Sequence, residues 1–359
     1  MMRGRLFLLG LPALVVALVA TGSPARADVT VDRSGSILVF PKVISNSERD
    51  TIIQISNTGN TLVHAHCFYT NAAPTNPNLP PGPTNPPLWQ ETDFFIWLTR
   101  QQPTHWTASQ GRPVNPFDSL GSEGAGLDPG LVPPVGSNFQ GELMCVEVGA
   151  DGNPVSGNHL KGEATLKTLA TGDVSKYAGI AILGGAGAGA TGRTLRLDNS
   201  QYNSCPNVLL LDHFSHGVEN PVIGSPNNLG ECPGGDCPIE TELTIIPCGR
   251  DFENQVPGTV TISIETFDEF EQLRSTSTTV TCWSDLPLDQ IGSGLPFVRD
   301  TLSVYARLRP VGGGGILGVA EEIHRDGAGR EARAAFNLHM EGDLVGEQGV
   351  IDEIVLTGP

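Results

Sequence analysis

Positively charged residues are scarce in this chain. Its 359 residues include 21 Lys and Arg, only four of them Lys, against 39 Asp and Glu, which gives a formal net charge of −18. A protein that binds nucleic acid needs Lys and Arg to neutralise phosphates, so this balance argues against a nucleic-acid partner. Charged residues of both signs make up only 17% of the chain, which also excludes a highly charged disordered protein.

Sequence motifs for catalysis are missing as well. The chain has no G-x-S-x-G nucleophile elbow, no H-E-x-x-H zinc motif and no D-x-D-x-D-G calcium loop. Residues 187–192 match the dinucleotide fingerprint G-x-G-x-x-G, but residues 194–197 are strand-like, whereas the fingerprint must open a helix. We therefore predict no cofactor and no catalytic residue, and the sequence favours a protein that is not an enzyme.

No apolar run outside the N-terminus is long enough to cross a membrane. Arg3 and Arg5 precede an apolar stretch at residues 6–20, and residues 25–27 read Ala-Arg-Ala, a small-x-small cleavage site. The stretch is shorter than the roughly 20 residues of a spanning helix. Residues 1–27 are therefore predicted to be a signal peptide, and the mature chain to be secreted, periplasmic or at the cell surface, with no transmembrane segment after cleavage.

Glycine and proline, in contrast, are abundant, with 44 Gly and 28 Pro. Residues 74–88 alone hold seven Pro, and residues 107–137 and 215–240 form two further Gly- and Pro-rich stretches. Proline cannot donate a hydrogen bond to a sheet, so such stretches interrupt strands. The sequence predicts long Pro- and Gly-rich loops at these places, either functional or disordered.

Short strand patterns fill most of the remaining chain, and we find no amphipathic helix longer than two turns. One set of alternating segments begins near residue 37 and a second near residue 241, and the segment before Pro41 corresponds to the segment before Pro247. Alternating short strands separated by turns are typical of antiparallel β-sandwiches. The prediction is an all-β protein made of two immunoglobulin-like antiparallel β-sandwich domains.

Residues 38–43, 50–57 and 66–69 resemble exported bacterial proteins of uncharacterised function with tandem immunoglobulin-like β-sandwich domains. The resemblance implies the same fold here, but it brings no activity and no site residues. The expected organisation is the signal peptide, a first β-sandwich domain at 28–214 with a Pro-rich insertion, a linker at 215–240, and a second β-sandwich domain at 241–359.

All seven cysteines lie in the predicted mature chain, where export favours disulfides. We predict the disulfides Cys67–Cys145 and Cys248–Cys282, because Cys67 and Cys282 occupy corresponding strands and share faces with apolar residues. One further bridge is expected among three other cysteines, with its pairing left open. These are Cys205, Cys232 and Cys237.

Two groups of residues are candidates for binding. His64 and His66 share one face of a strand, a geometry that can hold zinc or copper, although a polar outer face is the alternative. Trp89, Trp97 and Trp106 fall within 18 residues of one another, and exposed aromatic rings can stack on sugars or anchor a partner. Packing in the core is the alternative for these tryptophans. A third metal ligand could come from His105, His213 or His216.

The function expected from the sequence is non-catalytic structural or interaction work in the bacterial envelope or at the cell surface. The partner would be a protein or a glycan, which the sequence does not identify. The first alternative is a secreted carbohydrate-binding module that uses the aromatic residues near Trp97 and Trp106. The second is a metal-dependent hydrolase.

Overall fold

The structure is a computed structural model that describes residues 29–79, 84–113, 129–214, 216–218, 238–268, 270–290, 303–325 and 330–358. Strands dominate these residues, which contain a single α-helix, α1 (Leu344–Gln348), and a short 3-10 turn, η1 (Leu288–Gln290). The predicted all-β class is confirmed. The predicted signal peptide lies outside the described residues, as do Cys232 and Cys237 and most of the stretch at 215–240.

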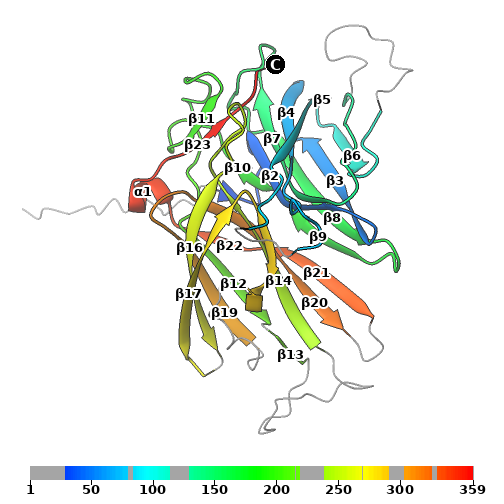
Figure 1. Cartoon of the computed structure of the whole chain (residues 1–359). Coiled ribbons are helices and arrows are strands. Elements are labelled where there is room, and N and C mark those ends of the chain that lie inside the picture. The colour runs from blue at the N-terminus through cyan, green and yellow to red at the C-terminus, as the bar shows by residue number, and fades with distance from the viewer. Residues whose placement is uncertain are drawn as a thin grey trace, which may run out of the picture.

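Two sheets from the first part of the chain pack around one apolar core (Figure 1). Phe40, Ile53, Ile96 and Leu166 are among the fully or almost fully buried residues of this core. The six-stranded sheet has the order β1 (Val29–Thr30), β10 (Ile180–Ile182), β2 (Ile37–Ser45), β7 (Phe139–Val148), β4 (Val63–Asn71) and β5 (Gln90–Leu98). The four-stranded sheet has the order β6 (Pro103–Thr107), β3 (Arg49–Asn57), β8 (Leu160–Thr168) and β9 (Val174–Ala178).

Two five-stranded sheets form the other part of the molecule. The first, the β12 sheet, has the order β17 (Leu273–Thr281), β16 (Thr259–Asp268), β19 (Ser303–Val311), β12 (Val208–Phe214) and β22 (His339–Glu341). The second, the β14 sheet, has the order β13 (His216–Val218), β14 (Pro238–Pro247), β20 (Ile316–Arg325) and β21 (Glu331–Asn337), with β18 (Ser284–Pro287) also paired to β14.

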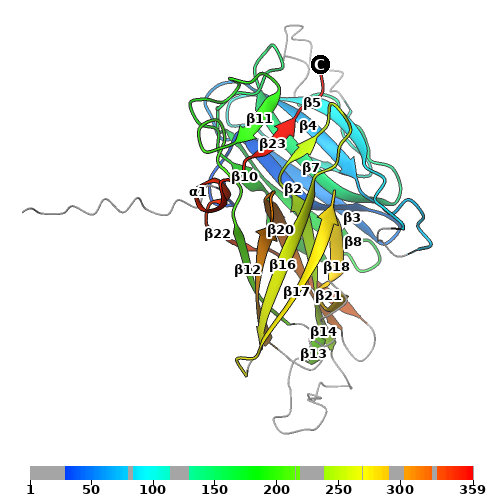
Figure 2. The ribbon, with the colours of Figure 1, turned by 60° about the vertical axis from the view of Figure 1, so that its left-hand side comes forward.

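A small fifth sheet brings distant parts of the sequence together. Its order is β11 (Thr194–Leu197), β23 (Asp352–Val355) and β15 (Arg250–Asp251). β11 runs antiparallel to β23, whereas β15 runs parallel to it. Figure 2 shows this sheet beside the six-stranded sheet. Buried residues from one face of the six-stranded sheet, such as Val39 and Val146, join those of the small sheet in one apolar cluster, which extends from Val29 to Leu356.

The prediction of two immunoglobulin-like β-sandwich domains is wrong. The described chain forms five small sheets, two of which combine strands from both predicted domains, and one core cluster runs through both. β12, which the predicted boundaries assign to the first domain, pairs with β19 and β22. Side-chain alternation predicts where strands lie and which face is buried. It does not predict which strands pair across more than a hundred residues.

A buried ionic cluster connects the two parts of the molecule. Pro41 cannot donate a ladder hydrogen bond, and the register of β2 against β7 shifts between Phe40 and Val43, as in a β-bulge. Lys42 lies in this irregular segment and is completely buried. We use the name ionic cluster for Lys42, Arg49, Glu242, Asp285, Glu321 and Arg333.

The ammonium group of Lys42 contacts three carboxylates from distant strands. Its Nζ lies 3.1 Å from Glu242 of β14, 2.9 Å from Asp285 of β18 and 3.3 Å from Glu321 of β20. The Nη1 of Arg49 donates to Glu321 over 2.8 Å. Burial alone would lower the pKa of Lys42, but the three carboxylates outweigh it and hold the pKa above its ordinary value. Lys42 is therefore charged and paired inside the protein.

Candidate functional site

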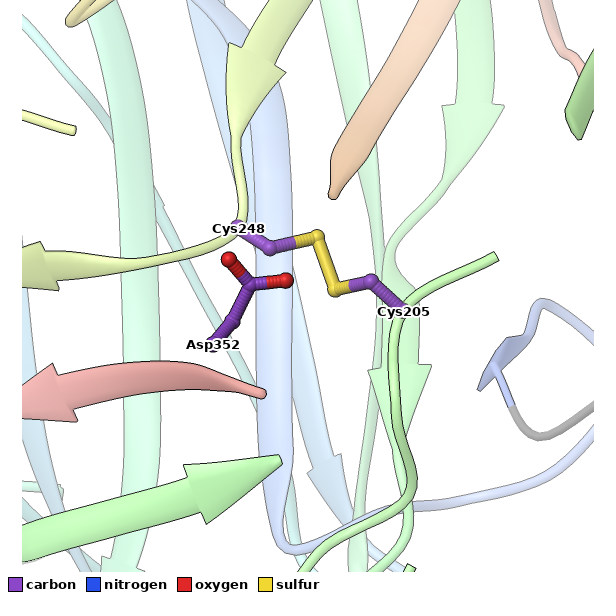
Figure 3. A group of neighbouring side chains, drawn as sticks. All are labelled: Cys205, Cys248 and Asp352. Carbon is purple, nitrogen blue, oxygen red and sulfur yellow. A yellow bond between two sulfur atoms is a disulfide. The ribbon is translucent and has the colours of Figure 1, made fainter. Parts of the chain in front are cut away.

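Cys205, Cys248 and Asp352 form a compact buried group where three strands come together (Figure 3). Cys248 follows β14, Cys205 precedes β12, and Asp352 begins β23. A disulfide joins the two cysteines, and the Oδ2 of Asp352 accepts a hydrogen bond from the backbone N–H of Gly315 over 2.8 Å. Gly315 has to be a glycine, because a Cβ there would collide with the Cβ of Cys205.

The two sulfur atoms and a carboxylate oxygen lie within 4.8 Å of one another, close enough to surround one metal ion. Zinc, however, binds the thiolate form of cysteine, and the sulfurs of a disulfide are not thiolates. In the disulfide form this group is therefore a cross-link beside a buried carboxyl group.

Burial is the main influence on the pKa of Asp352. It raises the pKa of the carboxyl group to about 6, although the Gly315 N–H group and the Arg250 guanidinium act in the opposite direction. Arg250 of β15 is itself buried, forms an ion pair with Glu142 of β7, and donates to the carbonyl oxygen of Pro247 over 2.5 Å. Asp352 consequently shares the Arg250 cation with another carboxylate.

The Asp352→Asn variant should change how stability depends on pH. Asp352 has a pKa of about 6 in the folded protein and 3.8 as a free side chain. The folded protein therefore holds a proton that the unfolded chain has lost, and stability decreases as the pH rises from about 4 to about 6. The full shift corresponds to about 3 kcal/mol. Asparagine does not titrate and can still accept from Gly315.

Urea unfolding of both proteins at several pH values between about 4 and 7 tests this expectation. The free energy of unfolding of the variant should increase relative to wild type by about 3 kcal/mol over that interval. Parallel stability profiles for the two proteins would contradict the buried, protonated state of Asp352.

One disulfide prediction agrees with the structure and one is wrong. Cys67 and Cys145 are bonded, and they lie directly opposite each other on β4 and β7 with Cα atoms 4.0 Å apart. Cys248 is bonded to Cys205 rather than to Cys282, which is free and buried. Cys282 follows the end of β17 with a positive φ of 66°, where the chain leaves the sheet. The prediction placed Cys282 within its strand, but β17 ends one residue earlier, at Thr281. Cys282 therefore does not occupy the position in its strand that Cys67 occupies in β4.

A second candidate group of side chains lies on the face of β4 and β5 that points away from the core around Phe40 and Ile96. His64 lies opposite Trp97 in the strand register, and His66 lies opposite Phe95. Each imidazole stacks on its partner, with ring centroids 3.6 Å apart for His64 and Trp97 and 4.0 Å apart for His66 and Phe95. We call these four residues the aromatic row.

The aromatic row is partly exposed, and Phe95 also packs against the core cluster that contains Phe68. His64, Phe95 and Trp97 are half-buried, whereas His66 is almost completely buried. The Nε2 atom of His66 lies 2.9 Å from Asp93 Oδ2. Burial lowers the pKa of His66 below its ordinary value, and the bond to Asp93 offsets this only in part. The row therefore presents mainly neutral ring surface.

Acidic and amide side chains border the aromatic row. Glu91 and Asp93 precede Phe95 at alternate positions of β5, so all three share one face. The Nε2 of Gln255 donates to Glu91 Oε2 over 2.9 Å. Burial is the main cause that raises the pKa of Glu91 to about 7, with smaller contributions from Asp93 and Glu253. Hydrogen-bonding groups thus stand next to flat rings.

The structure separates the candidate residues that the sequence grouped together. Trp106 is 2% exposed, and its indole N–H donates to the hydroxyl of Tyr69 over 2.6 Å, so Trp106 is a core residue. Trp89 is half-buried and stacks on buried Phe252. Of the three tryptophans, Trp97 alone belongs to the aromatic row.

The proposed metal ligands His64 and His66 are involved in ring stacking. Among the described residues, no third His, Cys or carboxylate completes a three-ligand group with both imidazoles. His105 lies on β6 of the other sheet, and His213 is buried on β12. The side chain of His216 lies outside the described side chains.

Sequence reasoning missed Phe95, Asp93 and Glu91. The signal was present, because these residues alternate with the core residues Phe94 and Ile96 on the strand that carries Trp97. Alternation on this strand would have placed all three on the face of Trp97.

Comparisons with known proteins give little information. No protein-family model matches the chain, and no curated protein matches it. The crystal structure of Thermotoga maritima 1070 is 12% identical, covering 39% of this chain and 98% of that chain, with a TM-score of 0.25. The cryo-EM structure of Broad Bean Stain Virus is 10% identical, covering 96% of this chain and 100% of that chain, with a TM-score of 0.17. Neither similarity supports an argument about fold or function.

The described residues contain no helix that is long and apolar enough to cross a membrane.

Proposed function

We propose that this chain is an exported, non-catalytic interaction protein of the bacterial envelope or cell surface, and that it binds its partner through the aromatic row. One observation carries the proposal. Trp97 and Phe95 are large rings that remain partly exposed beside a core cluster, each stacked on an imidazole.

Two physical properties of the aromatic row favour binding: its rings have fixed orientations, and hydrogen-bond acceptors lie beside them. The stacked rings already have fixed orientations, so a partner that covers them loses little additional side-chain entropy. Aromatic side chains dominate the energy of many binding surfaces. The carboxylates of Glu91 and Asp93 beside the rings can accept hydrogen bonds from the partner.

Export is supported by the cysteine chemistry together with the predicted signal peptide. The structure contains two disulfides, Cys67–Cys145 and Cys205–Cys248. Disulfides persist in oxidising compartments such as the periplasm and the cell exterior.

A carbohydrate-binding module is the second candidate function. The observation that favours it is the combination of flat rings with Glu91, Asp93 and Gln255 at their border. Sugars stack their apolar faces on such rings and donate hydroxyl hydrogen bonds to neighbouring carboxylates. A protein partner would use the same rings as apolar anchors, so the two candidates differ in what the row binds.

Replacing Trp97 by Ala should reduce binding by about thirtyfold or more, because a central aromatic anchor commonly contributes 2 kcal/mol or more. Binding of labelled protein would be measured on a glycan array and on bacterial cells before and after proteinase treatment. Loss of cell binding after proteinase treatment indicates a protein partner, and binding on the array indicates a glycan.

The matched control is Tyr305→Ala, which removes a half-buried aromatic ring from the outer face of β19 in a different sheet. This control should bind as wild type does. If Trp97→Ala retained full binding, or if Tyr305→Ala lost as much, the aromatic row would not be the binding surface.

A further inference from the structure

The free edges of the described sheets differ in how they are protected. An edge strand exposes unpaired N–H and C=O groups, and proteins usually protect it by making it short or by placing charges or proline on it. Most edge strands here have five residues or fewer. These short edges are β1, β6, β9, β11, β13, β15, β18 and β22.

Three edge strands are longer, and two of them carry charges along their length. β5 holds Glu91 and Asp93, and its Trp97 N–H already donates to the carbonyl of Pro129 over 2.7 Å. β21 holds Glu331 and Arg333, which form ion pairs with neighbouring strands. Both edges therefore have the expected protection.

The third long edge, β17, lacks this protection. Its nine residues read Leu-Arg-Ser-Thr-Ser-Thr-Thr-Val-Thr, with no proline and with Arg274 as the only charge. All nine pair with β16 in continuous register, so no bulge twists the edge away. No described segment pairs with the opposite side of β17, which lies at the outer margin of the sheet in Figure 1.

Exposed apolar groups lie at one end of this edge. Asp268 Oδ1 accepts from the N–H groups of Phe270 and Gln272, each over 2.9 Å, and so shapes the turn between β16 and β17. Phe270 in this turn is 71% exposed, and Leu273 at the start of β17 is 57% exposed. A partner strand along the edge would remove part of this apolar surface from water.

We propose that β17 pairs antiparallel with β17 of a second copy of the chain, so that the two β12 sheets become one continuous sheet around a two-fold axis. The proposal does not depend on the aromatic row or on the function assigned to it. It rests on the only long free edge without a carboxylate among the described strands.

The sequence of β17 is complementary to itself in this arrangement. If Ser277 lies on the two-fold axis, Thr276 faces Thr278 of the other copy, and Ser275 faces Thr279. Hydroxyl side chains then meet hydroxyl side chains, which is a favourable cross-strand pairing. The pairing already occurs within the chain, where the hydroxyls of Thr261 and Thr279 lie 3.0 Å apart across β16 and β17.

Charge also favours a second copy at this edge. A chain with a net charge of −18 repels its own copies, so contact between copies needs a seam without carboxylates. β17 has none, and its one charged residue, Arg274, would face Val280 rather than another Arg274. Salt should strengthen the pairing, because it screens repulsion between the rest of the two acidic chains.

Sedimentation velocity over a range of protein concentrations tests the pairing. We expect wild type to form a dimer and the double variant Ser275→Lys/Ser277→Lys to dissociate about tenfold more readily or more, since like charges would meet across the axis. The matched control is Thr261→Lys/Ser263→Lys, which adds the same charge to the same face one strand away from the edge. The control should dimerise as wild type does.

A cross-linking experiment guards against misfolding of the lysine variant. In a chain whose Cys232 and Cys237 are replaced by Ser, Ser277→Cys should be joined to a second copy by a short bismaleimide. Ser263→Cys and the parent chain, whose Cys282 is buried, should not. A wild-type protein that stays monomeric at every concentration would overturn the proposal. So would a dimer that the edge lysines leave intact, or equal cross-linking of the two cysteine variants.

Discussion

Replacing Lys42 by Met should destabilise the protein by about 3–5 kcal/mol, the cost of removing one partner from a buried charge pair. Lys42 is fully buried, and three carboxylates lie within 3.3 Å of its Nζ. Without the ammonium group, Glu242 and Glu321 would still pair with arginine, whereas Asp285 would keep only the Thr244 hydroxyl among its described partners. Urea unfolding followed by circular dichroism measures the loss.

The matched control is Lys176→Met. Lys176 pairs with Glu163 on the surface, where both side chains are about half exposed, and such pairs contribute about 0–1 kcal/mol. Adding Glu321→Gln to Lys42→Met should recover part of the stability, because it removes one of the uncompensated charges. Equal effects of the two lysine variants would show that the ionic cluster does not hold the sheets together.

The same cluster sets a limit at low pH. Burial would raise the pKa of Glu321, but Lys42 and Arg49 outweigh it and lower the pKa to about 2. A carboxyl group with a lowered pKa stabilises the fold above its ordinary pKa of 4.5 and loses this contribution as the pH falls toward 2. The contribution of the ionic cluster to the free energy of unfolding should therefore decrease as the pH falls toward 2. The contribution of Asp352 decreases in the opposite direction, as the pH rises from about 4 to about 6.

Removing the Cys67–Cys145 disulfide should have an effect of similar size. The two cysteines are 78 residues apart in the sequence, and the entropy of closing so long a loop in the unfolded chain corresponds to about 4.5 kcal/mol. The double variant Cys67→Ala/Cys145→Ala should lose about this amount in urea unfolding, together with a smaller loss from the buried sulfurs.

Cys282→Ala provides the comparison for the buried sulfur. Cys282 is buried but forms no cross-link, so its replacement measures the packing loss of one sulfur without any change in loop entropy. The double variant should cost clearly more than twice this amount. If it did not, the disulfide would contribute only through packing.

Local patterns made part of this fold predictable from the sequence. Alternation correctly placed Cys67 on the buried face of its strand, and Cys145 lies directly across from it on an adjacent strand. The pairing of Cys248 was not predictable in this way, because Cys205 reaches it through the meeting of β12, β14 and β23 rather than through one strand pair. Alternation carries no information about such three-way junctions.

The ionic cluster was hidden for a related reason. Lys42 lies within an apolar strand, which is a visible irregularity, but its carboxylate partners follow 200 or more residues later in the chain. The aromatic row was partly predictable, since Trp97 and the two histidines were recognised as candidates and Phe95 lies on the same face as Trp97. The partial exposure of the aromatic row depends on which distant segments pack over the sheet. Strand alternation does not predict that packing.

The small sheet of β11, β23 and β15 has a consequence for the order in which the chain can fold. β23 is the last of the described strands along the chain and lies between the other two. Neither β11 nor β15 can find its neighbour until nearly all 359 residues have been synthesised. Pairings between such distant segments slow folding, because a large loop has to close before any contact compensates for it. The small sheet is therefore expected to be among the last parts of the described fold to form.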